Sequence, residues 1–280
     1  MSQPQTWVPP GHFYSPLVDT DKLGGRASTV FGPQPPPVGI YLNLPNQLQL
    51  FHRLAEYYAS IPFEEKPKKG LRYYYDNPQF GYADAIILAT MIRHFKPKRI
   101  IEVGSGYSSA VMLDINEMFF GGSIQCKFIE PFPDDLHRLM KPRDQATVDV
   151  VPLGVEQVGA DFFQTLDAGD FLFIDSTHVS KCDSDVNHHF FRILPSLKPG
   201  VFIHFHDIFY PFEYPPTWFF QENRSWNEIY LLRAFLMHNS FYDIQFFNSL
   251  FFQTHRQEIT TRMPLFLKNS GGSFWMRKRS

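Results

Sequence analysis

The segment 98–109, Lys-Arg-Ile-Ile-Glu-Val-Gly-Ser-Gly-Tyr-Ser-Ser, most constrains how this chain can fold. A short apolar run ends at Glu102 and Val103, the tight turn Gly104-Ser105-Gly106 follows, and an amphipathic pattern then begins. This order is typical of a strand, a turn that approaches a nucleotide-like ligand, and a helix whose first N–H groups point at that ligand. Ser109 stands where a dinucleotide fingerprint has its third glycine, so the pattern favours a nucleoside without a pyrophosphate.

Strands and helices alternate through most of the chain. Apolar runs at residues 99–103, 124–130, 148–152, 171–175 and 201–206 are separated by helical patterns at 108–119, 133–140, 157–166 and 183–197. Continuous apolar strands between helices indicate a mainly parallel sheet with helices on both faces, an α/β fold. A helix at 226–238 and aromatic strands at 242–247 and 273–277 predict an antiparallel hairpin at one edge.

The first 79 residues differ in composition from the rest. Pro and Gly are dense up to residue 45, which excludes a regular helix or a central strand there. Aromatic residues at 12–14 favour an ordered arm or lid over a disordered tail, and helical patterns begin near residue 46 and cover 81–95. The chain therefore divides into an N-terminal arm or lid with an accessory helix, residues 1–79, and an α/β domain, residues 80–280.

Charge and hydropathy exclude several classes of partner. The formal net charge is -2 and no long Lys/Arg stripe occurs, which argues against nucleic acid. No segment approaches the roughly 18 apolar residues of a membrane span. Cys126 and Cys182 lack metal or redox spacing, so we expect both to be reduced in a cytoplasmic protein. A homo-oligomer stays open.

Acidic residues at two strand ends are candidate ligand contacts. Glu130 ends the second apolar run 24 residues after Gly106, where a carboxylate can accept hydrogen bonds from both hydroxyls of a ribose. Glu102 either contacts the ligand through water or backbone, or is a charge near the helix N-terminus.

Four ionisable residues follow the next two strands. Asp175 ends the fourth run, His178 follows it within a turn, and His206 and Asp207 end the fifth. Parallel neighbours lie about 4.8 Å apart and end at the same edge as the glycine turn, so we expect these four side chains to converge. They could deprotonate a nucleophile, or Asp175, His206 and Asp207 could hold a divalent metal. The alternative is that the histidines only fill buried strand ends.

Three motifs together resemble the class I S-adenosylmethionine-dependent methyltransferases: residues 102–109, Phe-Ile-Glu at 128–130 and Phe-Ile-Asp-Ser-Thr-His at 173–178. Leu-Pro-Ser-Leu-Lys-Pro-Gly at 194–200 is similar to the turn before that family's fifth strand. Within the class, the chain resembles the branch of macrolide-sugar O-methyltransferases and cephalosporin hydroxylase-like proteins. The resemblance runs from about residue 80 to the C-terminus and implies a Rossmann-like, seven-stranded sheet.

The resemblance also implies a cofactor and roles for particular residues. S-adenosyl-L-methionine is expected at Glu102, Gly104, Ser105, Gly106, Ser108, Ser109 and Glu130, with Glu130 on the ribose. Related sugar methyltransferases hold magnesium through an acid after the fourth strand and a Glu-Asp pair after the fifth. His206 stands in the place of that Glu, which favours a metal-free base or a softer metal.

These observations predict an S-adenosylmethionine-dependent methyltransferase that acts on a small molecule, by O-methylation. Asp175, His178, His206 and Asp207 are the candidate catalytic residues. The alternatives are a metal-dependent oxygenase or hydroxylase on the same scaffold, and a catalytically inactive cofactor-binding module. We expect the Pro- and aromatic-rich loop 207–218 to face the substrate. The tyrosines at 73–75 with Asn77 are either a second wall or part of the core.

Overall fold

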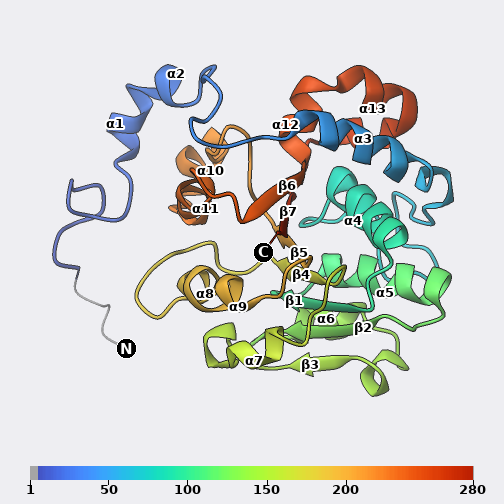
Figure 1. The fold of residues 1–280 in the computed structure, drawn as a ribbon. Coiled ribbons are helices and arrows are strands. Elements are labelled where there is room, and N and C mark those ends of the chain that lie inside the picture. Colours follow the sequence, from blue (N-terminus) through green and yellow to red (C-terminus); the bar gives the residue numbers. More distant parts are fainter. Residues whose placement is uncertain (1–5, 280) are drawn as a thin grey trace.

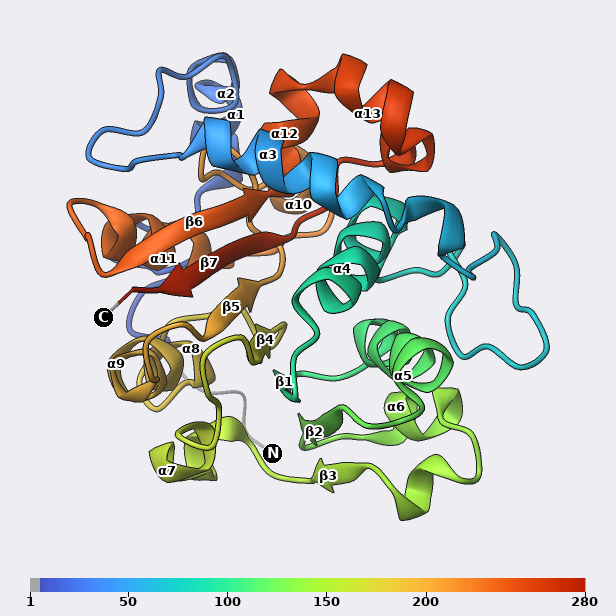
Figure 2. The same cartoon turned by 45° about the vertical axis from the view of Figure 1, so that its right-hand side comes forward.

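A seven-stranded sheet forms the centre of the computed structural model, which describes residues 6–279 (Figure 1). The strands are β1 Arg99–Val103, β2 Gln125–Ile129, β3 Asp149–Val151, β4 Phe171–Ile174, β5 Phe202–Phe205, β6 Tyr242–Phe247 and β7 Phe274–Lys278. Their spatial order is β3-β2-β1-β4-β5-β7-β6, and β7 runs antiparallel to β5 and β6 (Figure 2). The predicted α/β class, the parallel strands and the C-terminal hairpin are confirmed.

The register of the parallel strands places their carboxyl ends on one line. Val103 pairs with Ile129 of β2 and with Ile174 of β4, and Ile174 pairs in turn with Phe205 of β5. The residue that follows each of these strand ends therefore lies at the same edge of the sheet. This edge is where open α/β sheets bind their ligands.

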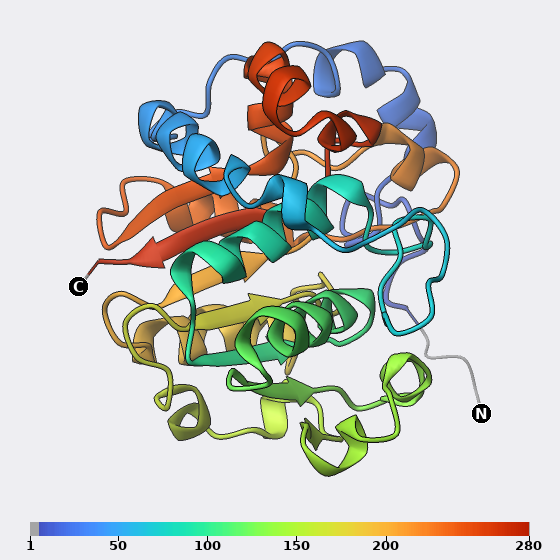
Figure 3. The same cartoon turned by 90° about the vertical axis from the view of Figure 1, so that its right-hand side faces the viewer.

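Successive residues of each strand face two separate apolar cores. In β4, Phe171 and Phe173 face the core built with α4 and α5, whereas Leu172 and Ile174 face the core built with α8 and α11. The first core is the one turned toward the viewer in Figure 3, where α4 and α5 cover the sheet. Burial on both faces explains why the parallel strands are almost wholly apolar.

The helices predicted after residue 45 are present, with differences at their ends, whereas the exclusion of helix before residue 45 is wrong. The bounds of the described helices are α1 Thr20–Gly24, α2 Ala27–Val30, α3 Leu44–Ala55, α4 Tyr82–Phe95, α5 Tyr107–Phe120, α6 Asp134–Leu139, α7 Ala160–Phe163, α8 Asp185–His188, α9 Leu194–Ser196, α10 Pro216–Phe220, α11 Glu228–Leu236, α12 Asn248–Thr254 and α13 Arg256–Arg262. Two short helices, α1 and α2, form in the part of the N-terminal segment that lacks proline, and α10, α12 and α13 were not predicted. The helix expected at 157–166 shrinks to α7, because Val158 and Gly159 are extended. The helix expected at 183–197 is interrupted by a π-helical stretch, His189–Ile193, between α8 and α9.

The N-terminal region packs on the α/β core in two ways. The ring of Phe31, just after α2, lies 5.8 Å from that of Phe219 in α10, on the outside of the segment that carries α10. Helix α3 packs beside β6, where Asn43 donates to the carbonyl of Ile244 and Gln47 accepts from the N–H of Phe247. Residues 44–55 therefore share the core of the sheet.

Two further expectations concern membranes and cysteines. Among residues 6–279, no helix combines the length and the apolar character that crossing a membrane requires. Cys126 is buried and Cys182 is exposed, and both are free thiols.

Candidate active site

A cavity of about 760 Å³ lies at the carboxyl edge of the sheet. Its walls come from the turn after β1, from the residues that follow β2, β4 and β5, and from two distant segments, 78–80 and 218–226. The residues at the strand ends are Gly104, Ser105, Gly106, Tyr107, Ser108, Glu130, Asp175, Ser176, His178, His206 and Asp207. The cavity thus brings together nine of the eleven predicted site residues and lacks Glu102 and Ser109.

The turn after β1 touches the backbone that follows β4. Gly104 has φ +81°, and its N–H donates to the carbonyl of Ile129 at 3.0 Å. A Cβ on Gly104 would lie 1.7 Å from the carbonyl oxygen of Asp175, so only glycine fits. Helix α5 begins at Tyr107, and its first N–H groups have no partner within the helix. The turn and this helix start therefore form a backbone cradle at the cavity.

Glu102 and Ser109 lie beneath the turn. Both are fully buried, and the hydroxyls of Ser108 and Ser109 donate to the two carboxylate oxygens of Glu102. Ser109 Oγ also accepts from the N–H of Gly106 at 3.0 Å. Burial raises the pKa of Glu102 to about 8, against the two serine hydrogen bonds. Glu102 and Ser109 therefore hold the shape of the turn, and only Ser108 of the three lines the cavity. The ligand contacts expected of Glu102, through water or backbone, and of Ser109 stay predictions.

Glu130 crosses from the end of β2 to the glycine turn. Its Oε2 accepts from the N–H of Ser105 at 3.1 Å, and its Oε1 accepts from the N–H of Phe132 at 2.9 Å. Each carboxylate oxygen keeps a free lone pair after these bonds. The carboxylate is thus fixed at the cavity wall with acceptor capacity left for a ligand.

A second group of side chains lies where β4 and β5 end. His178 Nε2 is 3.4 Å from Asp175 Oδ1 and 3.6 Å from Asp207 Oδ2. On the other side of the ring, His178 Nδ1 is 2.8 Å from Oε2 of Glu228, the first residue of α11. His206 Nε2 contacts Asp207 Oδ1 at 3.7 Å. We call Asp175, His178 and Asp207 the carboxylate–imidazole cluster.

The backbone of this cluster is strained. His178 has φ +60° and Asp207 has φ +57°, a region that residues other than glycine seldom adopt. Gly272 lies against Asp207, because a Cβ on Gly272 would come within 3.0 Å of the Asp207 backbone. Strain of this kind persists where the surrounding structure fixes a functional geometry.

Charges within the cluster shift one another's protonation. Partial burial opposes ionisation of Asp175, but the imidazoles of His206 and His178 outweigh it and hold the pKa of Asp175 below its usual range. Burial opposes protonation of His178, yet its contacts with Asp175 and Glu228 raise its pKa well above the ordinary value. Burial raises the pKa of Asp207, against the attraction of both imidazoles.

The donor atoms of the cluster suit a divalent cation. One atom from each of Asp175, His178 and Asp207 lies within 4.8 Å of the other two. The expected set was Asp175, His206 and Asp207; the structure groups His178 with the two aspartates instead. His206 lies beside the cluster, with its ring 5.2 Å from that of Phe80. The difference arises because His178 Nε2 lies near both aspartates, whereas His206 Nε2 contacts only Asp207.

Comparison with known proteins identifies the domain that contains this cavity. The family model described as "Methyltransferase domain" matches residues 101–208, which include the glycine turn, Glu130 and the whole cluster. An uncharacterized protein of Archaeoglobus fulgidus is 33% identical over 165 residues, covering 57% of this chain and 73% of that protein. The chain belongs to the class I S-adenosylmethionine-dependent methyltransferases.

Solved structures resemble this methyltransferase at low identity. The O-methyltransferase TomG from Streptomyces achromogenes, in complex with SAM, is 15% identical with a TM-score of 0.43, over 73% of this chain and 84% of that one. The SAH-bound methyltransferase PaMTH1 of Podospora anserina is 12% identical with a TM-score of 0.44, over 99% of this chain and 100% of that one. At these scores neither adds to the family match.

One wall of the cavity, formed by residues 218–226 and called here the tryptophan wall, contains three residues that the sequence did not single out. Trp218, Glu222, Arg224 and Trp226 line the cavity there. The Arg224 guanidinium lies 4.3 Å from the ring centroid of Trp218 and 4.5 Å from that of Trp226, and pairs with Glu222 at 2.6 Å. Trp218 was expected from the aromatic loop, but the other three lie beyond its predicted end.

The predicted aromatic walls are only partly at the cavity. Phe212 and Tyr214 of the loop 207–218 are buried in the core between the sheet and α11, so that part of the loop plugs the sheet end. Tyr73 and Tyr75 are likewise core residues. The side chain of Asn77 instead bonds to the backbone of its own turn, and Pro78, Gln79 and Phe80 reach the cavity.

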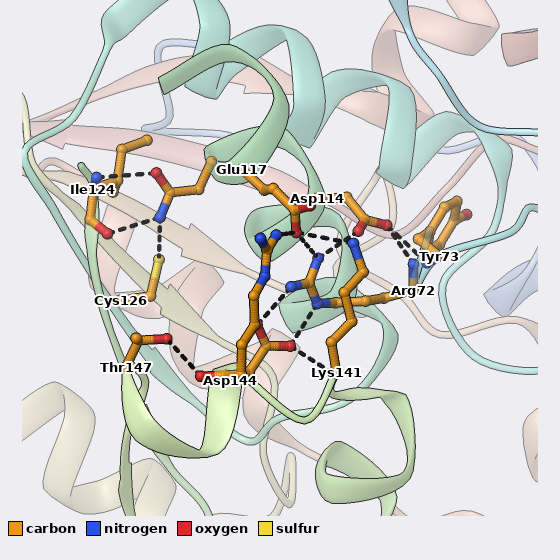
Figure 4. A network of polar contacts seen from close by, with 11 residues as sticks. Arg72, Tyr73, Asp114, Glu117, Ile124, Cys126, Lys141, Asp144 and Thr147 are labelled. Atoms are coloured by element: carbon orange, nitrogen blue, oxygen red, sulfur yellow. Dashed lines mark hydrogen bonds and ion pairs between the residues drawn. The ribbon is translucent and has the colours of Figure 1, made fainter. Parts of the chain in front are cut away.

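A buried ion network anchors the chain shortly before residues 78–80, which line the cavity (Figure 4). Arg72 donates two hydrogen bonds to Asp144, at 2.7 and 2.6 Å, and one to Asp114 of α5 at 2.7 Å. Glu117 completes the set at 2.9 Å. Removing one partner of such a buried set costs about 3–5 kcal/mol, because the others are left uncompensated. The network therefore ties the segment that leads to residues 78–80 firmly to α5.

Proposed function

We propose that this methyltransferase transfers a methyl group from S-adenosylmethionine to a hydroxyl group of a small molecule. The single observation that carries the proposal is the shared cavity: the backbone cradle after β1 and the carboxylate–imidazole cluster line the same space. A methyl donor and the group that receives the methyl must meet in line, and such a space permits it.

The cofactor half of the cavity extends from the glycine turn to Glu130. The N–H groups at the start of α5 suit a carboxylate, and Glu130 suits the two hydroxyls of a ribose. Ser105 supports this use, because its buried hydroxyl has no partner among the described residues and the residue lines the cavity. We assign Gly104, Ser105, Gly106, Ser108 and Glu130 to the cofactor, with Glu102 and Ser109 as support.

The reacting half lies at the carboxylate–imidazole cluster. S-adenosylmethionine supplies an electrophilic methyl group on sulfur. The chain must orient the acceptor oxygen toward it and take the oxygen's proton. His206 borders the cavity beside Asp207, so we assign it as the base that accepts this proton.

We further propose that Asp175, His178 and Asp207 hold a divalent cation. One imidazole nitrogen with two carboxylates favours Mn²⁺, Fe²⁺, Co²⁺ or Zn²⁺ over Mg²⁺, which prefers oxygen ligands alone. A cation there would lower the pKa of a coordinated hydroxyl. A cation would also stabilise the cluster, because it would offset the repulsion between the two aspartates that face His178.

The tryptophan wall is our candidate for the acceptor site. Trp218 and Trp226 offer ring faces, and Arg224 offers the guanidinium donors that Glu222 leaves free. A polar small molecule with a flat or cyclic body fits such a wall. The arm's contact with Phe219 supports the same segment from outside, which favours the arm or lid role expected for residues 1–79.

Two experiments test the proposal. Calorimetric titration with S-adenosylhomocysteine should give a saturable heat, and its absence would contradict the cofactor assignment. Methyl-labelled S-adenosylmethionine, offered with a panel of hydroxylated small molecules, should label a product in the presence of Mn²⁺. Consumption of dioxygen without methyl transfer would instead support the oxygenase alternative, which the family match does not favour.

A further inference from the structure

Glu228 is a buried carboxylate that none of the assignments above uses. It is the first residue of α11 and is 0% exposed. Its Oε2 contacts His178 Nδ1 at 2.8 Å, while no described residue donates to its Oε1. A carboxylate buried with half of its acceptor capacity unused is costly. Among the described residues, His178 makes the one hydrogen bond to this carboxylate.

The backbone of His178 is attached to the same helix start. The carbonyl of His178 accepts from the N–H groups of Asn227 and Glu228, at 3.0 and 3.1 Å. The ring of Trp226 lies 4.4 Å from the imidazole and covers it on one side. Main chain, ring face and Nδ1 are therefore all held by residues 226–228, which leaves His178 a single orientation.

This arrangement determines which nitrogen of the ring faces the cavity. An ionised Glu228 can only accept from Nδ1–H, and with that proton on Nδ1 the lone pair of a neutral imidazole is on Nε2. Nε2 is the atom that faces Asp175 and Asp207, at 3.4 and 3.6 Å. A carboxylate behind a histidine fixes the tautomer of metal-binding histidines in just this way.

We propose that Glu228 is a positioning residue that holds His178 as a metal ligand. The inference rests on the proposed function, because it needs the cation assigned to the carboxylate–imidazole cluster. Glu228 itself touches neither cation nor substrate; it acts through the imidazole.

Mn²⁺ titration of the full chain, after removal of metal by a chelator, tests this role. Glu228→Met keeps the length of the side chain but removes the acceptor, and should weaken Mn²⁺ binding by about 10–100-fold. Glu228→Gln keeps an acceptor oxygen for Nδ1–H and should recover most of that affinity. Glu213→Gln, a control at a half-buried acid paired with Tyr230, should bind Mn²⁺ like the wild type.

The outcomes separate this inference from the proposed function. A purely packing role for Glu228 predicts that the Met and Gln variants behave alike, and equal Mn²⁺ affinity in both would overturn the inference. So would a wild-type protein that binds S-adenosylhomocysteine but not Mn²⁺, a result that leaves methyl transfer intact. Failure of the wild type to bind S-adenosylhomocysteine would overturn the proposed function instead. If Glu228→Met does not fold, Glu228→Gln and His178→Asn decide: the first should retain Mn²⁺ and the second should lose it.

Discussion

The glycine turn and the carboxylate–imidazole cluster lie at the same edge of the sheet but are built in opposite ways. Next to the turn, Glu102 and Glu130 each have both carboxylate oxygens hydrogen-bonded within the chain. In the cluster, Asp175 and Asp207 face one imidazole at 3.4 and 3.6 Å, and His178 and Asp207 have left-handed backbones. The two carboxylates at the turn are thus fixed by short hydrogen bonds, whereas the two aspartates of the cluster are held only by longer contacts. The contrast teaches that one edge of the sheet can combine a rigid backbone cradle with a group of charges that is free to take a ligand.

The first substitution breaks the contact between the glycine turn and the backbone that follows β4. Gly104→Ala would place a Cβ 1.7 Å from the Asp175 carbonyl, at a φ of +81°. We expect a loss of about 3 kcal/mol or more in the free energy of unfolding, because both strand ends must move apart. Gly122→Ala is the control, since Gly122 also has a positive φ (+80°) but has nothing within 4 Å. Similar losses in both variants, measured by chemical denaturation, would show that the contact is unimportant.

A substitution in the carboxylate–imidazole cluster should weaken the binding of metal without weakening the binding of cofactor. Asp175→Asn removes one charged ligand and should weaken Mn²⁺ binding about 100-fold, or about 2.7 kcal/mol, while the affinity for S-adenosylhomocysteine stays at the wild-type value. Calorimetry measures both. Asp243→Asn, at a partly exposed pair with Arg279, is the control. Equal weakening of the two ligands in Asp175→Asn would mean that the regions are not independent.

The reciprocal substitution removes the carboxylate that contacts the glycine turn. Glu130→Ala removes the carboxylate proposed to hold the ribose and should weaken S-adenosylhomocysteine binding about tenfold, or about 1.4 kcal/mol, with Mn²⁺ affinity unchanged. Glu222→Ala, in the tryptophan wall, is the control and should leave the affinity for S-adenosylhomocysteine unchanged. Unchanged affinity in Glu130→Ala would remove Glu130 from the cofactor site.

The last prediction concerns the pH dependence of stability. The pKa of Glu102 is raised to about 8, so between its usual value near 4.5 and pH 8 the unfolded chain ionises this acid while the folded chain keeps it protonated. Glu102 therefore lowers stability progressively as pH rises through that window, and ceases to add to the loss above it. Glu102→Gln should flatten this part of the profile. Denaturation curves at pH 5.5 and 8 with the same difference as the wild type would contradict the assignment.

The sequence predicted the edge of the sheet better than the walls of the cavity. Residues that directly follow parallel strands, such as Glu130, Asp175 and His206, could be placed because register aligns strand ends. Glu228 could not, because an acid in the first turn of a helix ordinarily serves the helix dipole. Arg72 joins acids 42 and 72 residues away, a pairing that no local pattern encodes.

The position of Glu102 beneath the turn has a physical reason of its own. Glu102 is the last but one residue of β1, and side chains alternate across a strand, so its carboxylate points beneath the turn rather than outward. The serines at the start of α5 then meet it from above. The sequence shows that side chains alternate along β1. It does not show which of the two faces of this strand lies under the turn.

A crystal structure of the protein with S-adenosylhomocysteine and Mn²⁺ tests the central claim most directly. We expect the nucleoside to lie over Gly104–Gly106 with its ribose on Glu130, and the cation to lie between Asp175, His178 and Asp207 in the same cavity. The sulfur of S-adenosylhomocysteine should point toward that cation. A nucleoside bound elsewhere, or one whose sulfur points away from the cluster, would contradict the shared site on which the proposed methyl transfer depends.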